Sequence, residues 1–269
     1  LLKYANDDKL YLPVENIDVL SRYGSDVLEE SLDKLGGVSW GSRKEKLKKR
    51  IKFLAEELMA VAAKRQMSSA EIINVPEDFY EEFCSRFPFE ETNDQFNAIH
   101  SVINDLEKGQ PMDRLICGDV GFGKTEVALR ASFLTAMSGK QVAILAPTTL
   151  LARQHYETFK NRFRGFPINI NELSRLTAKK DDVIKKINSG SSDIVIGTHS
   201  LLGDKIEFND LGLLIIDEEQ HFGVKHKEKI KKLKSNIHIL TLTATPIPRT
   251  LQLAMTGVRD LSIIASPPV

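Results

Sequence analysis

A glycine-rich segment offers the clearest chemistry in the chain. It lies between an apolar stretch and a helix-like stretch, and it matches G-x-x-x-x-G-K-[ST] through Gly118, Asp119, Val120, Gly121, Phe122, Gly123, Lys124 and Thr125. The backbone N–H groups of such a loop, backed by a helix N-terminus, favour phosphate oxygens. Lys124 would reach the β- and γ-phosphates, and the Thr125 hydroxyl would bind Mg²⁺. A plain glycine-rich turn is the structural alternative, but it leaves the Lys-Thr pair unexplained.

Two adjacent carboxylates end the apolar run LGLLIID at residues 211–217. Open α/β proteins bind ligands at the carboxyl edge of the sheet, so Asp217 and Glu218 would face a nucleotide there. Asp217 would hold the magnesium, usually through water, and Glu218 would align or deprotonate the attacking water. Surface acids capping the next helix are the structural alternative. With the glycine-rich segment, the pair predicts a nucleoside triphosphatase whose catalytic residues are Lys124, Asp217 and Glu218.

The segment from Phe87 to Gln95, FPFEETNDQ, has two interpretations. Thr92 and Gln95 have the spacing of a helix capping box, which would make Gln95 purely structural. An amide can also donate to one adenine edge atom and accept from another, while an aromatic ring such as Phe87 stacks on the base. On the second interpretation the nucleotide is ATP, and Phe87 and Gln95 select it.

Three short polar segments follow successive predicted strands on the nucleotide side of the sheet. Hydroxyls, backbone amides and an arginine can contact a phosphodiester backbone without reading bases. The candidate DNA-binding residues are Thr148, Thr149, Ser174, Arg175, Thr198 and His199. A Thr-Thr pair after a strand is more often a helix cap, so the joint position of the segments is what favours nucleic acid.

A hydroxyl-rich segment, Thr243-Ala-Thr245-Pro, ends the last predicted core strand. Thr243 and Thr245 would be able to touch both the Asp217–Glu218 carboxylates and a bound strand, which would link hydrolysis to movement. The lysine run at 225–234 could also support DNA, although a solvated helix face is the simpler interpretation.

Short apolar runs alternate with amphipathic stretches from residue 76 onward. The runs lie at 114–117, 141–146, 168–171, 193–198, 211–217 and 238–243. Helical patterns between them cover 125–137, 150–163 and 181–187. Continuous apolar strands separated by helices predict an α/β fold with a mostly parallel sheet covered by helices on both faces.

The first 75 residues have another pattern. Residues 9–20 alternate apolar and polar side chains, which indicates two short β segments. Ser42-x-x-Glu45 fits a capping box, and the helical spacing of apolar residues beyond it predicts one long amphipathic helix over 43–66. The first half of this helix is strongly basic. The basic residues form either a solvated helix face or a face that binds a partner or phosphate. A shift to acidic composition marks a domain boundary near 70–76.

Composition excludes a uniformly basic nucleic-acid binder, because 37 Lys and Arg balance 37 Asp and Glu. That balance hides unlike segments: residues 41–66 hold nine basic and three acidic groups, whereas residues 71–94 hold one and eight. A ligand senses the local patch, since screening acts over about 8 Å. Two distant cysteines indicate a reducing compartment without structural zinc. With neither a membrane-length apolar run nor a leader, we expect a cytoplasmic protein without membrane partners, cut from a longer chain.

The ordered motifs resemble the first RecA-like domain of superfamily 2 helicases. They are FPFEETNDQ, GDVGFGKT, APTTLLARQHYETF, GTHSLL, LLIIDEEQHFGVKHKE and LTLTATPIPRTL. More narrowly, the chain resembles bacterial transcription-repair coupling factors, which are double-stranded DNA translocases. RecG-type helicases share the glycine-rich segment, the acidic box with FGV, and TATPIPRTL, but KLYLPVENIDVLSRY, LDKLGGVSW and the basic helix favour the coupling factors.

The resemblance implies three parts: the end of an RNA polymerase interaction domain at 1–24, a linker with the long helix at 25–75, and a RecA-like, ATP-binding domain at 76–269. It implies double-stranded DNA and RNA polymerase as partners, and the excision-repair machinery through absent domains. Position 220 is glutamine where some members carry histidine. Gln220 therefore joins Thr243 and Thr245 as a residue that couples hydrolysis to movement.

The implied function is that of the ATP-binding half of a translocase. The whole protein would displace RNA polymerase stalled at lesions and promote recruitment of nucleotide excision repair. Because the second RecA-like domain is missing, this piece alone is expected to be weakly active or inactive. Two alternatives stay open: a RecG-like enzyme that remodels replication forks, and a non-catalytic ATP-binding docking module.

Overall fold

The computed structural model divides the chain into two compact units, Leu1–Leu58 and Met59–Val269. It describes residues 2–3, 9–11, 45–46, 48–49, 52, 56, 59–60, 63, 67–74, 77–223, 226, 229–230, 237–244 and 259–268. In the first unit, β1 (Leu2–Lys3) and β2 (Lys9–Leu10) form an antiparallel pair. Every described position from 45 to 63 is helical, as expected, but the apolar positions that predicted this helix lie outside the described residues. The functional division at 24/25 and 75/76 stays a prediction.

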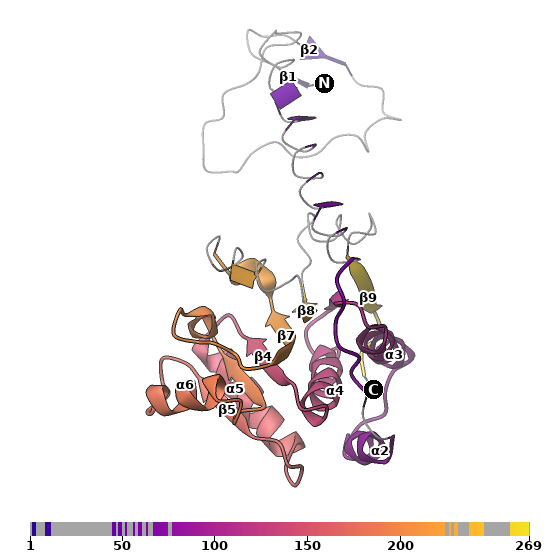
Figure 1. Ribbon diagram of the computed structural model, residues 1–269. Coiled ribbons are helices and arrows are strands. Elements are labelled where there is room, and N and C mark those ends of the chain that lie inside the picture. The colour runs from indigo at the N-terminus through magenta and orange to yellow at the C-terminus, as the bar shows by residue number, and fades with distance from the viewer. Residues whose placement is uncertain are drawn as a thin grey trace. The chain divides into compact units, whose positions relative to one another are not determined.

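The second unit is built on a seven-stranded sheet in the order β5-β6-β4-β7-β8-β3-β9 (Figure 1). All six strand pairings are parallel, which confirms the expected α/β sheet. The strands are β3 (Asp113–Gly118), β4 (Gln141–Leu145), β5 (Ile170–Leu173), β6 (Ile194–Gly197), β7 (Leu211–Asp217), β8 (His238–Thr243) and β9 (Asp260–Ile264).

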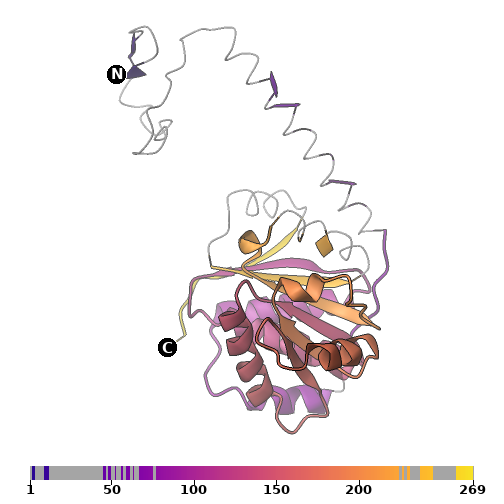
Figure 2. The ribbon, with the colours of Figure 1, turned by 90° about the vertical axis from the view of Figure 1, so that its left-hand side faces the viewer.

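Helices cover both faces of this sheet (Figure 2). Successive side chains of a strand point to opposite faces, so Val142 and Ile144 join one buried cluster, whereas Ala143 and Leu145 join the other. The first cluster packs against α2 to α5, and the second against α6 and a short 3-10 helix, η3. The helices are α2 (Glu77–Ser85), α3 (Asn93–Glu107), α4 (Lys124–Met137), α5 (Thr149–Arg162), α6 (Lys180–Asn188), η3 (His199–Leu202) and η4 (Glu219–His221).

Two strands differ from the sequence expectation. β5 begins two residues later than its apolar run, because the Asn169 N–H donates to the Asp193 carboxylate (2.7 Å) before the ladder starts. β9 was missed because it is an edge strand with exposed positions such as Ile263, so it lacks the continuous apolar run of its neighbours. Within the described part of the chain, no helix combines the length and apolar character needed to cross a membrane.

The segment before α2 packs along the second unit. The backbone N–H of Ala70 donates to the Gly109 carbonyl (2.9 Å), and that of Ile73 donates to the Leu106 carbonyl (3.1 Å). Ile73 is buried in the same cluster as α3 and α4. Residues 70–74 therefore belong to the second unit, because they bond to the end of α3 and the loop after it and bury Ile73 in its core.

Candidate nucleotide-binding site

The glycine-rich loop leaves β3 and enters α4, as its motif predicts. Gly121 and Gly123 have φ angles of 84° and 80°, in the left-handed region that favours glycine. A Cβ on Gly123 would lie 2.3 Å from the Gln95 amide nitrogen, so no larger residue fits there without displacing Gln95. The loop therefore has the backbone freedom and the helix N-terminus that a phosphate site needs.

Lys124, the first residue of α4, folds back over this loop. Its Nζ donates to the carbonyl oxygens of Gly118 (2.6 Å) and Asp119 (2.8 Å). The Asp119 carboxylate accepts from the Val120 N–H (2.7 Å), which closes the turn locally. The ammonium group is thus held beside the loop amides, where a nucleotide's phosphates would meet it.

Gln95 serves the structural role that its motif left open. Thr92 and Gln95 form a reciprocal capping box at the start of α3. The Gln95 Nε2 also donates to the Phe122 carbonyl (3.0 Å), so the buried amide braces the phosphate loop from α3. This contact between distant segments could not be read from the motif, and the adenine contact of Gln95 stays a prediction.

Two guanidinium groups lie near the ring of Phe87. The guanidinium carbons of Arg130 and Arg162 are 5.9 Å and 5.6 Å from its ring centroid, within cation–π range. Phe89, whose ring centroid is 5.6 Å from that of Phe87, is 64% exposed. Phe89 is thus the more accessible ring for base stacking, although its position in the sequence motif did not distinguish it from Phe87.

The acidic pair lies at the carboxyl edge of the sheet, one strand away from the phosphate loop. Asp217 ends β7, and β8 separates β7 from β3. At about 4.8 Å per strand, the ends of β7 and β3 are roughly 10 Å apart. Glu218 has φ 52° and ψ 62°, and it alone among the described non-glycine residues has a positive φ. The chain therefore turns sharply between the two carboxylates and sends them in different directions.

Glu218 is hydrogen-bonded to the segment that ends β8. Its Oε2 accepts from the Thr243 hydroxyl (2.9 Å) and its Oε1 from the Ala244 N–H (2.8 Å). The Gln220 amide also donates to Oε2. The expected contact of Thr243 with the Asp217–Glu218 carboxylates is thus present, whereas the Gln220 contact was not expected. Thr245 lies outside the described residues, and the coupling roles of all three residues stay predictions.

Asp217 has a partner that no motif predicted. The His155 Nε2 on α5 lies 2.9 Å from the Asp217 Oδ2. Hydrogen bonds among the described residues use only this oxygen, so Oδ1 is left for a cation or its water shell. Mg²⁺ typically takes one or two protein oxygens and completes its shell with waters and phosphates. Thr125 and Asp217 fit that requirement, and the described residues contain no cluster of three or more His, Cys, Asp or Glu able to hold a metal alone.

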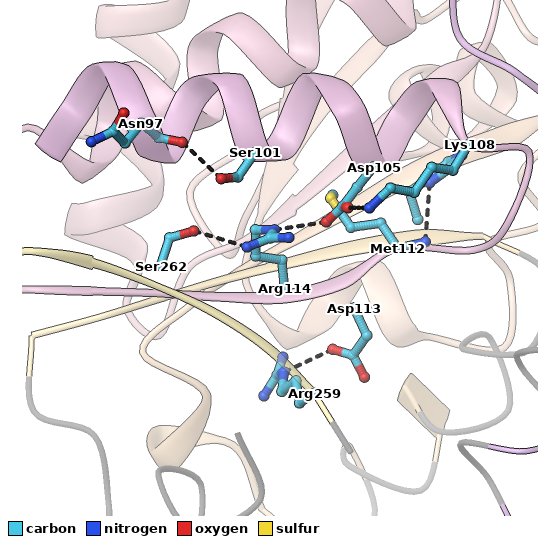
Figure 3. Close-up of polar contacts among 10 residues, drawn as sticks. Asn97, Ser101, Asp105, Lys108, Met112, Asp113, Arg114, Arg259 and Ser262 are labelled. Carbon is cyan, nitrogen blue, oxygen red and sulfur yellow. Dashed lines mark hydrogen bonds and ion pairs between the residues drawn. The ribbon is translucent and has the colours of Figure 1, made fainter. Parts of the chain in front are cut away.

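Two arginines form ion pairs and hydrogen bonds around β3 and β9, and Figure 3 shows Arg259 with Asp113 and Arg114 with Asp105 and Ser262. Arg259, just before β9, pairs with Asp113 at the start of β3 (2.8 Å) and with Glu219 beside the acidic pair (3.0 Å). Burial lowers the pKa of Arg259, but the two carboxylates outweigh it and raise the pKa, so the guanidinium stays charged. Across the same strands, Arg114 links Asp105 of α3 (2.7 Å) to Ser262 of β9 (2.9 Å).

The candidate DNA-binding residues follow three adjacent strands, β5, β6 and β4. Thr148 is the N-cap of α5, as the structural alternative predicted, because its hydroxyl accepts from the Leu151 N–H (3.2 Å). Ser174 and Thr198 are buried, and the Ser174 hydroxyl donates to the Glu172 carboxylate (2.8 Å). The exposed members are Thr148, Arg175 and His199, and Thr149 is half-buried. The grouping at one sheet edge is present, and contact with DNA stays a prediction.

The sheet with its phosphate loop, acidic box and linked threonine segment defines a helicase ATPase domain. The family model described as DEAD/DEAH box helicase matches residues 92–254, more than half of the chain. The chain belongs to this family, and ATP is the nucleotide that such a domain binds.

Relatives narrow the similarity further. The chain is 54% identical over 272 residues to the transcription-repair-coupling factor of Rickettsia bellii, covering 99% of this chain and 24% of the relative. It is 53% identical over 270 residues to that of Bacillus subtilis, covering 99% of this chain and 23% of the relative. The chain thus spans about a quarter of the length of these relatives. Among solved structures, RecG bound to a three-way DNA junction has a TM-score of 0.64 and 33% identity, covering 78% of this chain and 29% of RecG.

Proposed function

We propose that the chain is the ATP-binding half of a motor that moves along double-stranded DNA and couples transcription to DNA repair. One observation carries the motor part: Glu218, the candidate hydrolytic base, is hydrogen-bonded to Thr243 and Ala244, which leave the neighbouring strand. A change at the γ-phosphate is thereby passed to a segment outside the nucleotide site. The names of the relatives support the coupling of transcription to repair.

Each residue has a defined task in the proposed reaction. The loop amides and Lys124 bind the phosphates, and Thr125 and Asp217 hold Mg²⁺, which neutralises charge on the phosphate oxygens. Glu218 orients the attacking water and takes its proton. Because Asp217 and Glu218 are turned apart by the left-handed backbone of Glu218, one carboxylate serves the metal and the other serves the water.

DNA would lie across the carboxyl ends of β5, β6 and β4. Thr148, Arg175 and His199 are the exposed residues there, and they would hold the backbone without reading bases. RNA polymerase and the excision-repair machinery would bind through parts of the protein beyond the helicase domain. The basic helix over 43–66 is a candidate route between those parts and the motor.

Lys124→Ala in the full-length parent tests this proposal directly. Losing a charge-assisted contact to phosphate costs about 1.5–3 kcal/mol, so nucleotide affinity should fall roughly 10- to 100-fold. DNA-stimulated ATPase and displacement of a stalled RNA polymerase should be lost with it. Equal displacement by both proteins would contradict the motor proposal.

A fork-remodelling activity like that of RecG is the second candidate, supported by the similarity to the RecG structure bound to a three-way junction. The two are separated by substrate: a coupling factor displaces stalled polymerase on duplex DNA, whereas a fork remodeller needs the junction. ATPase stimulated by a three-way junction far more than by plain duplex, with no polymerase displacement, would favour the second candidate.

A further inference from the structure

One side-chain contact links α5 to the end of β7 at the carboxyl edge of the sheet. The His155 Nε2 lies 2.9 Å from the Asp217 Oδ2, and both side chains are largely buried, at 13% and 14% exposure. The two residues are 62 positions apart. The contact occurs because β4, which leads into α5, pairs with β7 in the sheet.

The sheet order divides the candidate residues into two groups. Those proposed for DNA follow β5, β6 and β4, whereas those proposed for the nucleotide follow β7, β8 and β3. The border between the groups is the β4–β7 pair. α5 begins at this border with Thr149 and carries His155 six residues later, about 9 Å along the helix axis. The first turn of α5 thus lies beside the residues proposed for DNA, and its second turn carries His155, which contacts the proposed magnesium ligand Asp217.

The geometry suits a group that orients a metal-binding carboxylate. An imidazole that donates from Nε2 fixes the rotation of the Asp217 carboxylate and occupies Oδ2. Oδ1 is then presented in one direction. Partners of this kind set the orientation of metal ligands in proteins, and removing one typically weakens metal binding about 10- to 100-fold.

We propose that His155 is a positioning residue that fixes Asp217 for Mg²⁺ and transmits to it the position of α5. This rests on the proposed function, because it needs a magnesium–nucleotide site and a DNA-binding end of α5. His155 itself contacts neither the metal nor the nucleotide.

The test is the binding of a fluorescent ATP analogue to this chain, with EDTA and over a Mg²⁺ titration. His155→Leu replaces the imidazole with an apolar side chain of similar size and removes the donor, whereas His155→Gln keeps an N–H donor at similar reach. We expect equal nucleotide affinity in EDTA for all three proteins. The Mg²⁺ concentration for half-maximal enhancement should rise about tenfold or more in His155→Leu and return to within about twofold of wild type in His155→Gln.

Thr158→Leu is the matched control, since it places leucine at an exposed position on the same helix. It should bind Mg²⁺ and nucleotide as wild type does. An unchanged Mg²⁺ dependence in His155→Leu would overturn the proposal, as would an equal loss of affinity with and without Mg²⁺, which indicates a structural role alone. Absence of any Mg²⁺-dependent binding in wild type would instead overturn the proposed function.

A second measurement tests the link through α5, in the full-length protein with and without duplex DNA. In wild type, DNA should lower the Mg²⁺ concentration needed for half-maximal nucleotide binding. In His155→Leu, DNA should bind with similar affinity but shift that concentration by less than about twofold. A DNA-induced shift of wild-type size in His155→Leu, or no shift in wild type, would overturn the link.

Discussion

Glu218 combines an unusual backbone conformation with a carboxylate that receives three hydrogen bonds. Its left-handed backbone costs about 1–2 kcal/mol for a residue with a Cβ, and its partners Thr243, Ala244 and Gln220 hold it in place. Thr243 and Ala244 therefore depend on Glu218 for these hydrogen bonds. Substitutions of Glu218 should change turnover and these contacts together.

Glu218→Gln should keep nucleotide binding and lose turnover. Glutamine cannot take a proton, so the rate of ATP hydrolysis in the full-length protein should fall by about 10²- to 10⁴-fold. It also has only one side-chain oxygen for the two donors, Thr243 and Ala244, that now use different oxygens. Steady-state ATPase and equilibrium nucleotide binding measure the two effects. The exposed Glu207→Gln is the control, and normal function in Glu218→Gln would favour a docking module.

The carboxylate of Asp94 should make the stability of the fold depend on pH. Its carboxylate accepts from the Ser266 hydroxyl (2.8 Å) and from the N–H groups of Ser266 (2.9 Å) and Ala265 (3.0 Å). These bonds lower the pKa of Asp94 below its usual 3.8. Because the pKa of Asp94 is lower in the folded protein than in the unfolded one, these bonds stabilise the fold fully at pH values above the unfolded-state pKa. The stabilisation is lost as the pH falls through the folded-state pKa.

We therefore expect Asp94→Ala to lower the melting temperature at neutral pH and to have a shrinking effect below about pH 4. Thermal unfolding of wild type and variant across this range measures the difference. Asp78, an exposed residue on α2, gives the control Asp78→Ala. A difference in melting temperature that grows toward low pH would contradict the assignment of these bonds to the ionised carboxylate.

At the scale of elements, α2 packs on the unit chiefly through Phe83, its one fully buried side chain, with Tyr80 half-buried beside it. Phe83 is fully buried, with its ring centroid 4.3 Å from that of Phe133 on α4 and 5.0 Å from that of Phe163. The helix is otherwise mostly exposed. Its attachment beside the segment that leads to Gln95 therefore depends on this cluster.

Phe83→Ala should lower the free energy of unfolding by about 3–5 kcal/mol, through lost burial and the cavity left behind. Phe79→Ala on the same helix, where the side chain is 47% exposed, should cost far less. Urea unfolding of this chain followed by circular dichroism measures both. Equal losses would show that the helix and not the buried ring determines the stability.

Local patterns predicted most elements and the residue types of the site. Apolar runs identified six of the seven parallel strands, and the five interior strands are apolar along most of their length because both of their faces are buried. β9 lacked that signal, since Ile263 and other positions are exposed at the sheet edge. Motif spacing identified Lys124 and the acidic pair. It could not show that His155 meets Asp217, because that contact depends on which strands become neighbours.

At the scale of the whole molecule, the chain spans about a quarter of the length of its relatives. The proposed motor needs a second RecA-like domain that closes on this one. We expect this chain alone to bind ATP weakly and to hydrolyse it at a small fraction of the rate of the full-length protein, with little stimulation by DNA. Steady-state ATPase on both proteins measures this. A rate for the isolated chain that equals the full-length rate would contradict it.

The sheet order also has a consequence for synthesis on the ribosome. β3, which leads into the phosphate loop, pairs with β8 on one side and β9 on the other, and both lie roughly 120 to 140 residues later in the chain. At about 5–20 residues per second, the β3 segment waits several seconds or longer for either neighbour. Until then its backbone edges are open to chaperones and to other nascent chains, and ATP has no complete site to bind. A chain whose synthesis stops before residue 238 would therefore lack both neighbours of β3, and nucleotide binding could not stabilise it.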